Sequence, residues 1–100
     1  MTKATEILDS LNASVKDKVT VSINGFDFLF HRDDFAYDEM ANSIEAKNKL
    51  TPIKDYLLAI VDKSQKDDLL KIINIPTVAP QIAGKVNEVF TPKLAISVKN

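Results

Sequence analysis

The sequence predicts an α+β fold that is mainly α, in which an N-terminal β-hairpin packs on a bundle of three to four short helices. Two alternating apolar segments flank Asn24-Gly25, and most of the later chain has apolar residues at helical spacing. A two-stranded hairpin is not stable alone in water, so the helices are expected to cover its apolar face. The 100 residues are enough for one hydrophobic core and too few for two.

The hairpin is predicted over residues 18–31. Asn-Gly favours a two-residue type I′ turn, because both central residues of that turn need positive φ. Such a turn pairs six apolar residues on one face: Val19 with Phe30, Val21 with Phe28, and Ile23 with Phe26. We therefore expect the three phenylalanines to lie in the core.

Four helices are predicted after the hairpin, over about residues 33–46, 52–62, 65–73 and 78–90. Their starts carry capping signals, namely Asp33 or Asp34, Thr51 before Pro52, Ser64 with Asp67, and Thr77. Gly84 lies inside the last helix, where glycine costs ~1 kcal/mol relative to alanine. A close approach of another backbone, internal or from a partner, would explain it.

Separate predictions concern the two ends of the chain, and the short N-terminal helix would need packing to hold it. Residues 1–17 form an N-terminal segment with a short helix over about residues 4–12, and residues 18–100 form the single domain. Residues 92–100 are expected to be an extended C-terminal arm, because its apolar residues alternate with others as in a strand.

Composition excludes several classes of function. The net charge is -1, from 13 basic and 14 acidic residues, and binding to nucleic acid needs a positive surface. Without cysteine the chain has no disulfides, thiolate zinc sites or cysteine nucleophiles. No apolar run approaches the ~20 residues that cross a bilayer, and the start lacks a signal-peptide core. We expect a cytoplasmic protein that binds neither nucleic acid nor membrane.

No residue pattern indicates an active site. His31 is the only histidine and could pair with Asp33 or Asp34, but one imidazole beside loop carboxylates is a poor metal site. The carboxylates that follow the hairpin lack the ligand spacing of a calcium loop and suit the start of a helix instead. The chain is therefore predicted to be no enzyme and to need no cofactor or metal.

Five apolar residues are predicted to contact a partner. Leu29 falls on the polar face of the hairpin, and Leu58 falls away from the main apolar stripe of its helix. The other three, Leu94, Ile96 and Val98, alternate along the arm.

The order of motifs resembles the small tail assembly chaperones of long-tailed bacteriophages. The motifs are Phe26-Asp27-Phe28-Leu29-Phe30, Asp34-Phe35-Ala36-Tyr37-Asp38-Glu39-Met40, Asn48-Lys49-Leu50-Thr51-Pro52, Asp55-Tyr56-Leu57, Asp68-Leu69-Leu70, Ile82-Ala83-Gly84-Lys85-Val86 and Phe90-Thr91-Pro92-Lys93-Leu94. The resemblance covers about residues 18–99.

This resemblance implies a non-catalytic chaperone that holds the long, largely helical tape measure protein and helps to recruit tail tube subunits. It implies action in the host cytoplasm and absence from the mature virion, and self-association is compatible with it. Two rival readings are a small DNA-binding regulator, which the charge disfavours, and a phage-encoded inhibitor of a host protein.

Overall fold

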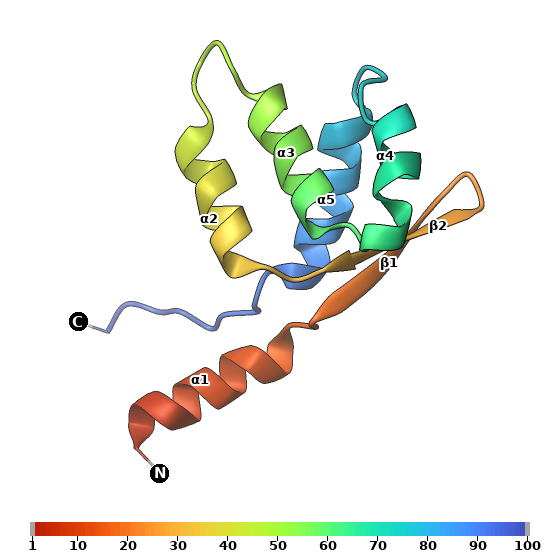
Figure 1. The fold of residues 1–100 in the computed structure, drawn as a ribbon. Coiled ribbons are helices and arrows are strands. Elements are labelled where there is room, and N and C mark those ends of the chain that lie inside the picture. The colour runs from red at the N-terminus through yellow and green to blue at the C-terminus, as the bar shows by residue number, and fades with distance from the viewer. Residues whose placement is uncertain (1, 100) are drawn as a thin grey trace.

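The computed structural model describes residues 2–99 and confirms an α+β fold that is mainly α. In chain order the elements are α1 (Lys3–Ser14), β1 (Lys18–Ile23), β2 (Phe26–His31), α2 (Asp34–Ser43), α3 (Leu50–Ile60), the 3₁₀-helix η1 (Lys63–Gln65), α4 (Lys66–Ile72) and α5 (Val78–Phe90). Helices α2 to α5 all lie on one side of the hairpin, whereas α1 lies apart from them (Figure 1).

The hairpin has the register that the sequence predicts. Asn24 and Gly25 have φ values of 51° and 88°, as a type I′ turn requires. β1 and β2 pair antiparallel, with Val19 opposite Phe30, Val21 opposite Phe28 and Ile23 opposite Phe26. The apolar side chains thus share one face.

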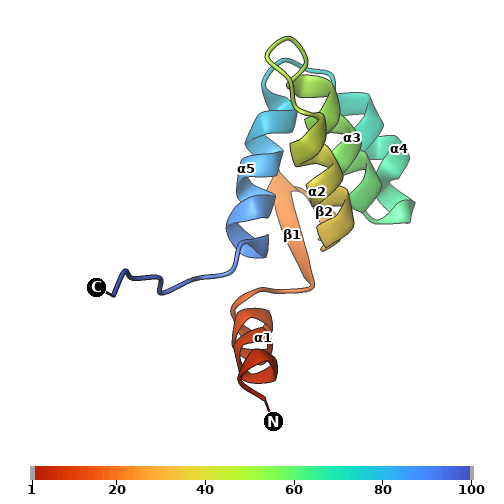
Figure 2. The ribbon, with the colours of Figure 1, turned by 90° about the vertical axis from the view of Figure 1, so that its left-hand side faces the viewer.

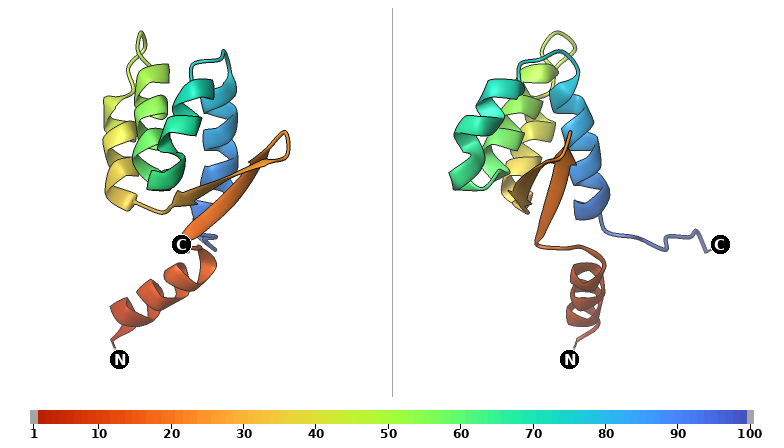
Figure 3. Two further views of the ribbon diagram at one scale, coloured as in Figure 1. Left: turned by 45° about the vertical axis from the view of Figure 1, so that its right-hand side comes forward. Right: turned by 90° about the vertical axis from the view of Figure 1, so that its right-hand side faces the viewer.

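The core forms where the helices cover the base of the hairpin. Five large side chains are almost fully buried there, Phe30, Leu57, Leu69, Ile73 and Val86. Phe28 is buried with them, but Phe26 is 74% exposed, so its prediction as a core residue is wrong. The tip of the hairpin, where β2 begins at Phe26, extends past α4 (Figure 3).

The two edges of the hairpin differ in their hydrogen bonding. The backbone N–H of Leu29 donates to Gln65 Oε1 at 2.7 Å, and Gln65 Nε2 donates to the carbonyl of Asp27 at 2.6 Å. The N–H of Asp62 donates to the carbonyl of Leu29 at 2.8 Å. The outer edge of β2 is therefore closed by the segment that connects α3 to α4.

Helix starts follow the sequence prediction only in part. Asp33 caps α2 as predicted and accepts a hydrogen bond from the N–H of Ala36 at 3.0 Å. The predicted caps Thr51 and Ser64 are wrong, since α3 begins at Leu50 without a side-chain cap and Asp62 caps η1. α2 ends at Ser43 rather than 46, because Glu45 and Asn48 bond to each other in the loop to α3.

The ends of the chain project from the body. α1 buries none of its residues, and residues 92–99 have no regular secondary structure (Figure 2). The radius of gyration is 15.7 Å, compared with about 13 Å for a compact chain of this length. The excess reflects these two extensions.

Candidate functional site

The polar residues form one notable pair, which lies at the base of β2. His31 Nε2 is 2.8 Å from Asp62 Oδ1, so the partner of this histidine is not Asp33 or Asp34. Hydrogen bonds from Ser64 and then from His31 lower the pKa of Asp62 to about 2. The same carboxylate caps η1, and this local role accounts for its position. Among residues 2–99, no three His, Cys, Asp or Glu side chains gather as a metal site would require.

The predicted partner contacts divide into two groups. Leu29 and Leu58 are half-buried, and Leu58 packs against the core cluster. Leu94, Ile96 and Val98 are 54%, 81% and 83% exposed. The five residues therefore do not form one surface. The three residues of the arm are the ones whose side chains are largely accessible.

Several exposed apolar side chains were not predicted from the sequence. Ile7 and Leu8 lie on α1, Phe26 lies at the hairpin tip, and Phe35 lies in the first turn of α2 with 72% exposure. Alternation and helical spacing show which residues share a face, but they do not show which face a neighbour covers. No signal in the sequence separates Phe26 from Phe28 in this respect.

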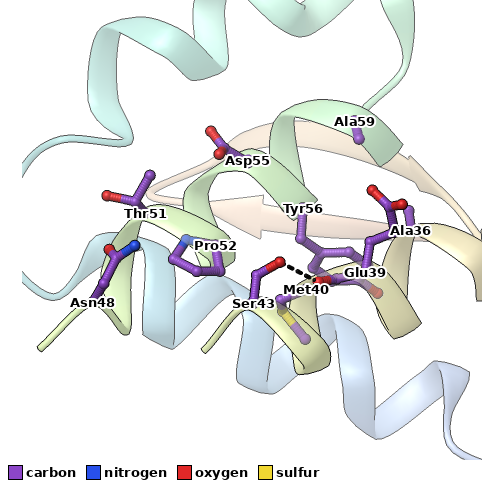
Figure 4. Close-up of a pocket in the computed structure, with 10 residues that line it drawn as sticks. All are labelled: Ala36, Glu39, Met40, Ser43, Asn48, Thr51, Pro52, Asp55, Tyr56 and Ala59. Atoms are coloured by element: carbon purple, nitrogen blue, oxygen red, sulfur yellow. Dashed lines mark hydrogen bonds between the residues drawn. The ribbon is translucent and has the colours of Figure 1, made fainter. Parts of the chain in front are cut away.

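A groove of about 360 Å³ lies between α2 and α3 and is the candidate site considered for a partner (Figure 4). Met40 and Tyr56 are buried side chains that contribute to its lining, and Pro52 adds a third buried residue. Glu39 from α2 and Asp55 from α3 are exposed at the same groove. The groove thus has partly apolar walls and two exposed carboxylates.

Helical spacing explains why these side chains meet. Positions three, four and seven apart lie on one face of a helix. The residues from α2 are Ala36, Glu39, Met40 and Ser43, and those from α3 are Thr51, Pro52, Asp55, Tyr56 and Ala59. These faces of α2 and α3 form the two walls of the groove because the helices pack side by side (Figure 1).

The electrostatics of the groove favour a basic partner. Glu39 and Asp55 are the charged side chains of its lining, and no lysine or arginine lines the groove. Ser43 donates its hydroxyl hydrogen to the carbonyl of Glu39 at 2.7 Å, so it is satisfied within its own helix. Burial raises the pKa of Tyr56 to about 12, and this tyrosine donates to Asn87 Oδ1 at 3.2 Å. Tyr56 is therefore an uncharged side chain that a hydrogen bond holds in place at the groove.

Gly84 does not serve the internal role expected of it. A Cβ atom built at this position meets nothing within 4 Å, and the residue is exposed on α5. The explanation of Gly84 by close approach of another backbone is therefore wrong for the described residues.

Among residues 2–99, no helix is both long and apolar enough to cross a membrane.

Comparison with known proteins identifies similar chains. A family model described as phage tail assembly chaperone matches residues 19–100. An uncharacterized 11.3 kDa protein from the lys 3′ region of Haemophilus phage HP1 (strain HP1c1) is 57% identical over 99 residues, which are 99% of this chain and 97% of that protein. No solved structure matches the chain.

Proposed function

Because the chain belongs to the phage tail assembly chaperone family, we propose that it binds the tape measure protein of its phage and assists assembly of the tail tube without catalysing a reaction. The observation that carries the proposal is the groove between α2 and α3, which has apolar walls, two carboxylates and no basic residue. An amphipathic helix with lysine or arginine beside its apolar stripe is the complementary ligand.

The arm is the second surface proposed for the client. Leu94, Ile96 and Val98 make no hydrogen bond to the rest of the described chain and are largely exposed. Leu29 and Leu58 remain proposed contacts as well, although each must first be uncovered because it is half-buried. A chaperone released when the tube forms needs contacts of modest affinity, and separate small patches supply them.

We further propose that the protein acts in the host cytoplasm, also contacts the tail tube protein, and does not remain in the finished virion. The acidic face of α2 opposes the rival role of a DNA-binding regulator, since phosphates would repel it. Capture of a host protein in place of a tail component would favour the inhibitor reading instead.

The test is co-expression of this chain with the tape measure protein of the same phage, measuring the fraction of tape measure protein that stays in solution. We expect Glu39→Lys with Asp55→Lys to lower that fraction, because the charges at the groove are reversed. The matched control is Asp67→Lys with Glu88→Lys, which makes the same change of charge at exposed residues outside the groove. Circular dichroism checks that both variants fold.

The outcomes separate the function from its site. If the unmodified chain does not keep the tape measure protein in solution, the proposed function is wrong. If the unmodified chain does so and the groove variant works equally well, the function stands and the groove assignment is wrong. Leu94→Asp with Ile96→Asp tests the arm in the same way, without disturbing a packed residue.

A further inference from the structure

The outer edge of β1 is an open strand edge. The backbone groups of Leu29 bond to Gln65 and Asp62, so they point away from β1. In an antiparallel pair the residue opposite such a residue also points its backbone groups outward. Thr20 is opposite Leu29, and Ser22 is opposite Asp27. Among residues 2–99, no segment bonds to the outward groups of Thr20 and Ser22.

A groove of about 270 Å³ runs beside this open edge. Its apolar lining residues are Val21 and Ile23 from β1 and Val78 and Ile82 from α5. An added strand would place every second side chain over this groove, because side chains alternate along a strand. The edge therefore offers backbone partners and apolar contacts together.

The C-terminal arm has the matching properties. Residues 93–99 are exposed, and no hydrogen bond joins them to other described residues. Leu94, Ile96 and Val98 alternate with Ala95 and Ser97, so the arm has the pattern of an unpaired strand. In Figure 2 and in the right-hand view of Figure 3 the arm points away from its own body.

We propose that the arm of a second copy of this chain adds to the outer edge of β1 as an antiparallel strand. The register that aligns the two patterns places Ser97 opposite Thr20 and Ala95 opposite Ser22. It also places the three apolar residues of the arm opposite those of β1: Val98 opposite Val19, Ile96 opposite Val21, and Leu94 opposite Ile23. A slip of one residue would turn the apolar side chains to the wrong face.

The chain's own arm reaches this antiparallel register only along a fully extended path. The first turn of α5 lies beside Ile23, because both line the same groove. The 13 residues of α5 then carry the chain about 19 Å away from that end of the groove. The four Cα–Cα steps from Phe90 to Leu94 span at most about 14 Å, so Leu94 would approach Ile23 only if this segment ran straight back along α5. The arm of a second copy meets no such constraint, so the second copy is the partner assigned here.

The proposed contact is weak enough to be reversible. It consists of one short strand, and its last pair sets Lys99 opposite Lys18, where like charges repel. Raised salt should strengthen the association by screening this pair.

The test exploits the absence of cysteine from the chain. Two full-length variants, Thr20→Cys and Ser97→Cys, are mixed under mild oxidation, with one of them carrying a mass tag. We expect a disulfide-linked heterodimer to form about tenfold faster than in a mismatched mixture of Thr20→Cys with Ala95→Cys, because only the aligned pair has Cβ atoms within disulfide reach. Equal rates in the two mixtures would overturn the register and the proposal.

Two more measurements complete the test. The double variant Thr20→Cys/Ala95→Cys would close a disulfide within one chain if the arm folded back in parallel onto its own β1, and that result would overturn the second copy as partner. Ser97→Pro removes the N–H that faces Thr20, whereas Ser97→Ala keeps it. In sedimentation experiments on the full chain, we expect Ser97→Pro to abolish association and Ser97→Ala to retain it. Monomeric unmodified protein at all concentrations would also overturn the proposal.

Discussion

The base and the tip of the hairpin have the same sequence pattern and opposite environments. Phe30 is fully buried on β2, against which α3 packs, whereas Phe26, four residues earlier on the same face, is 74% exposed. Alternation therefore decides which face a side chain occupies, and the position of the helices decides whether that face is buried. The tip is therefore the part of the hairpin that the helices leave exposed.

The largest effect is expected at the base of the hairpin. Phe30→Ala should lower the free energy of unfolding by about 3–5 kcal/mol, because it removes a fully buried ring and leaves a cavity. Urea denaturation followed by circular dichroism measures this change. A loss below 1 kcal/mol would mean that the helices do not pack on this face.

A smaller effect is expected at the closed edge of β2. Gln65→Ala should cost about 1–2 kcal/mol, because the N–H of Leu29 and the carbonyl of Asp27 lose their partner. The isosteric control Gln65→Glu keeps the acceptor for Leu29 but cannot donate to Asp27, so its loss should be intermediate. Thermal denaturation of the three proteins at one pH compares them, and equal stabilities would contradict the bridging role.

The pair at the base of β2 predicts a dependence on pH. The folded pKa of Asp62 lies at about 2, below the ordinary value of 3.8. Its contribution to stability is therefore fully present above about pH 4 and is lost as the pH falls through about 2. The difference in melting temperature between the unmodified chain and Asp62→Asn should shrink over this range. A constant difference in melting temperature would show that the pKa of the Asp62 carboxyl is not lowered in the folded chain.

The smallest effect is expected at the tip. Phe26→Ala should change the free energy of unfolding by no more than about 0.5 kcal/mol, since the ring is mostly exposed. The same denaturation experiment compares it directly with Phe30→Ala. A loss of more than 2 kcal/mol would mean that the tip is covered in solution, and concentration dependence of that loss would point to another copy as the cover.

The sequence predicted the local features of this fold well. The Asn24-Gly25 turn, the strand register and the Asp33 cap depend on residues close together in the chain, and all three are confirmed. The start of α3 was displaced by two residues because Leu50 and Thr51 continue the helix without a side-chain cap. Local signals of this kind fix the type of an element better than its ends.

The contacts between distant segments could not be predicted from the sequence. His31 meets Asp62 and Leu29 meets Gln65 only because the segment that connects α3 to α4 lies along the outer edge of β2. The groove between α2 and α3 likewise depends on how two helices pack, and no spacing in one segment reveals it. The exposure of Leu94, Ile96 and Val98 was predictable, since no complementary segment remained to cover the arm.

Helix α1 has a consequence for amide hydrogen exchange. Its 12 residues bury no side chain, and an isolated helix of this length is marginal in water. Its amide protons should therefore exchange at rates near those of a free peptide, while those of α3 and α5 exchange only when the body opens. Slow exchange in α1 is expected only when another molecule lies against Ile7 and Leu8. The exchange rate of this helix therefore measures whether another molecule is bound there.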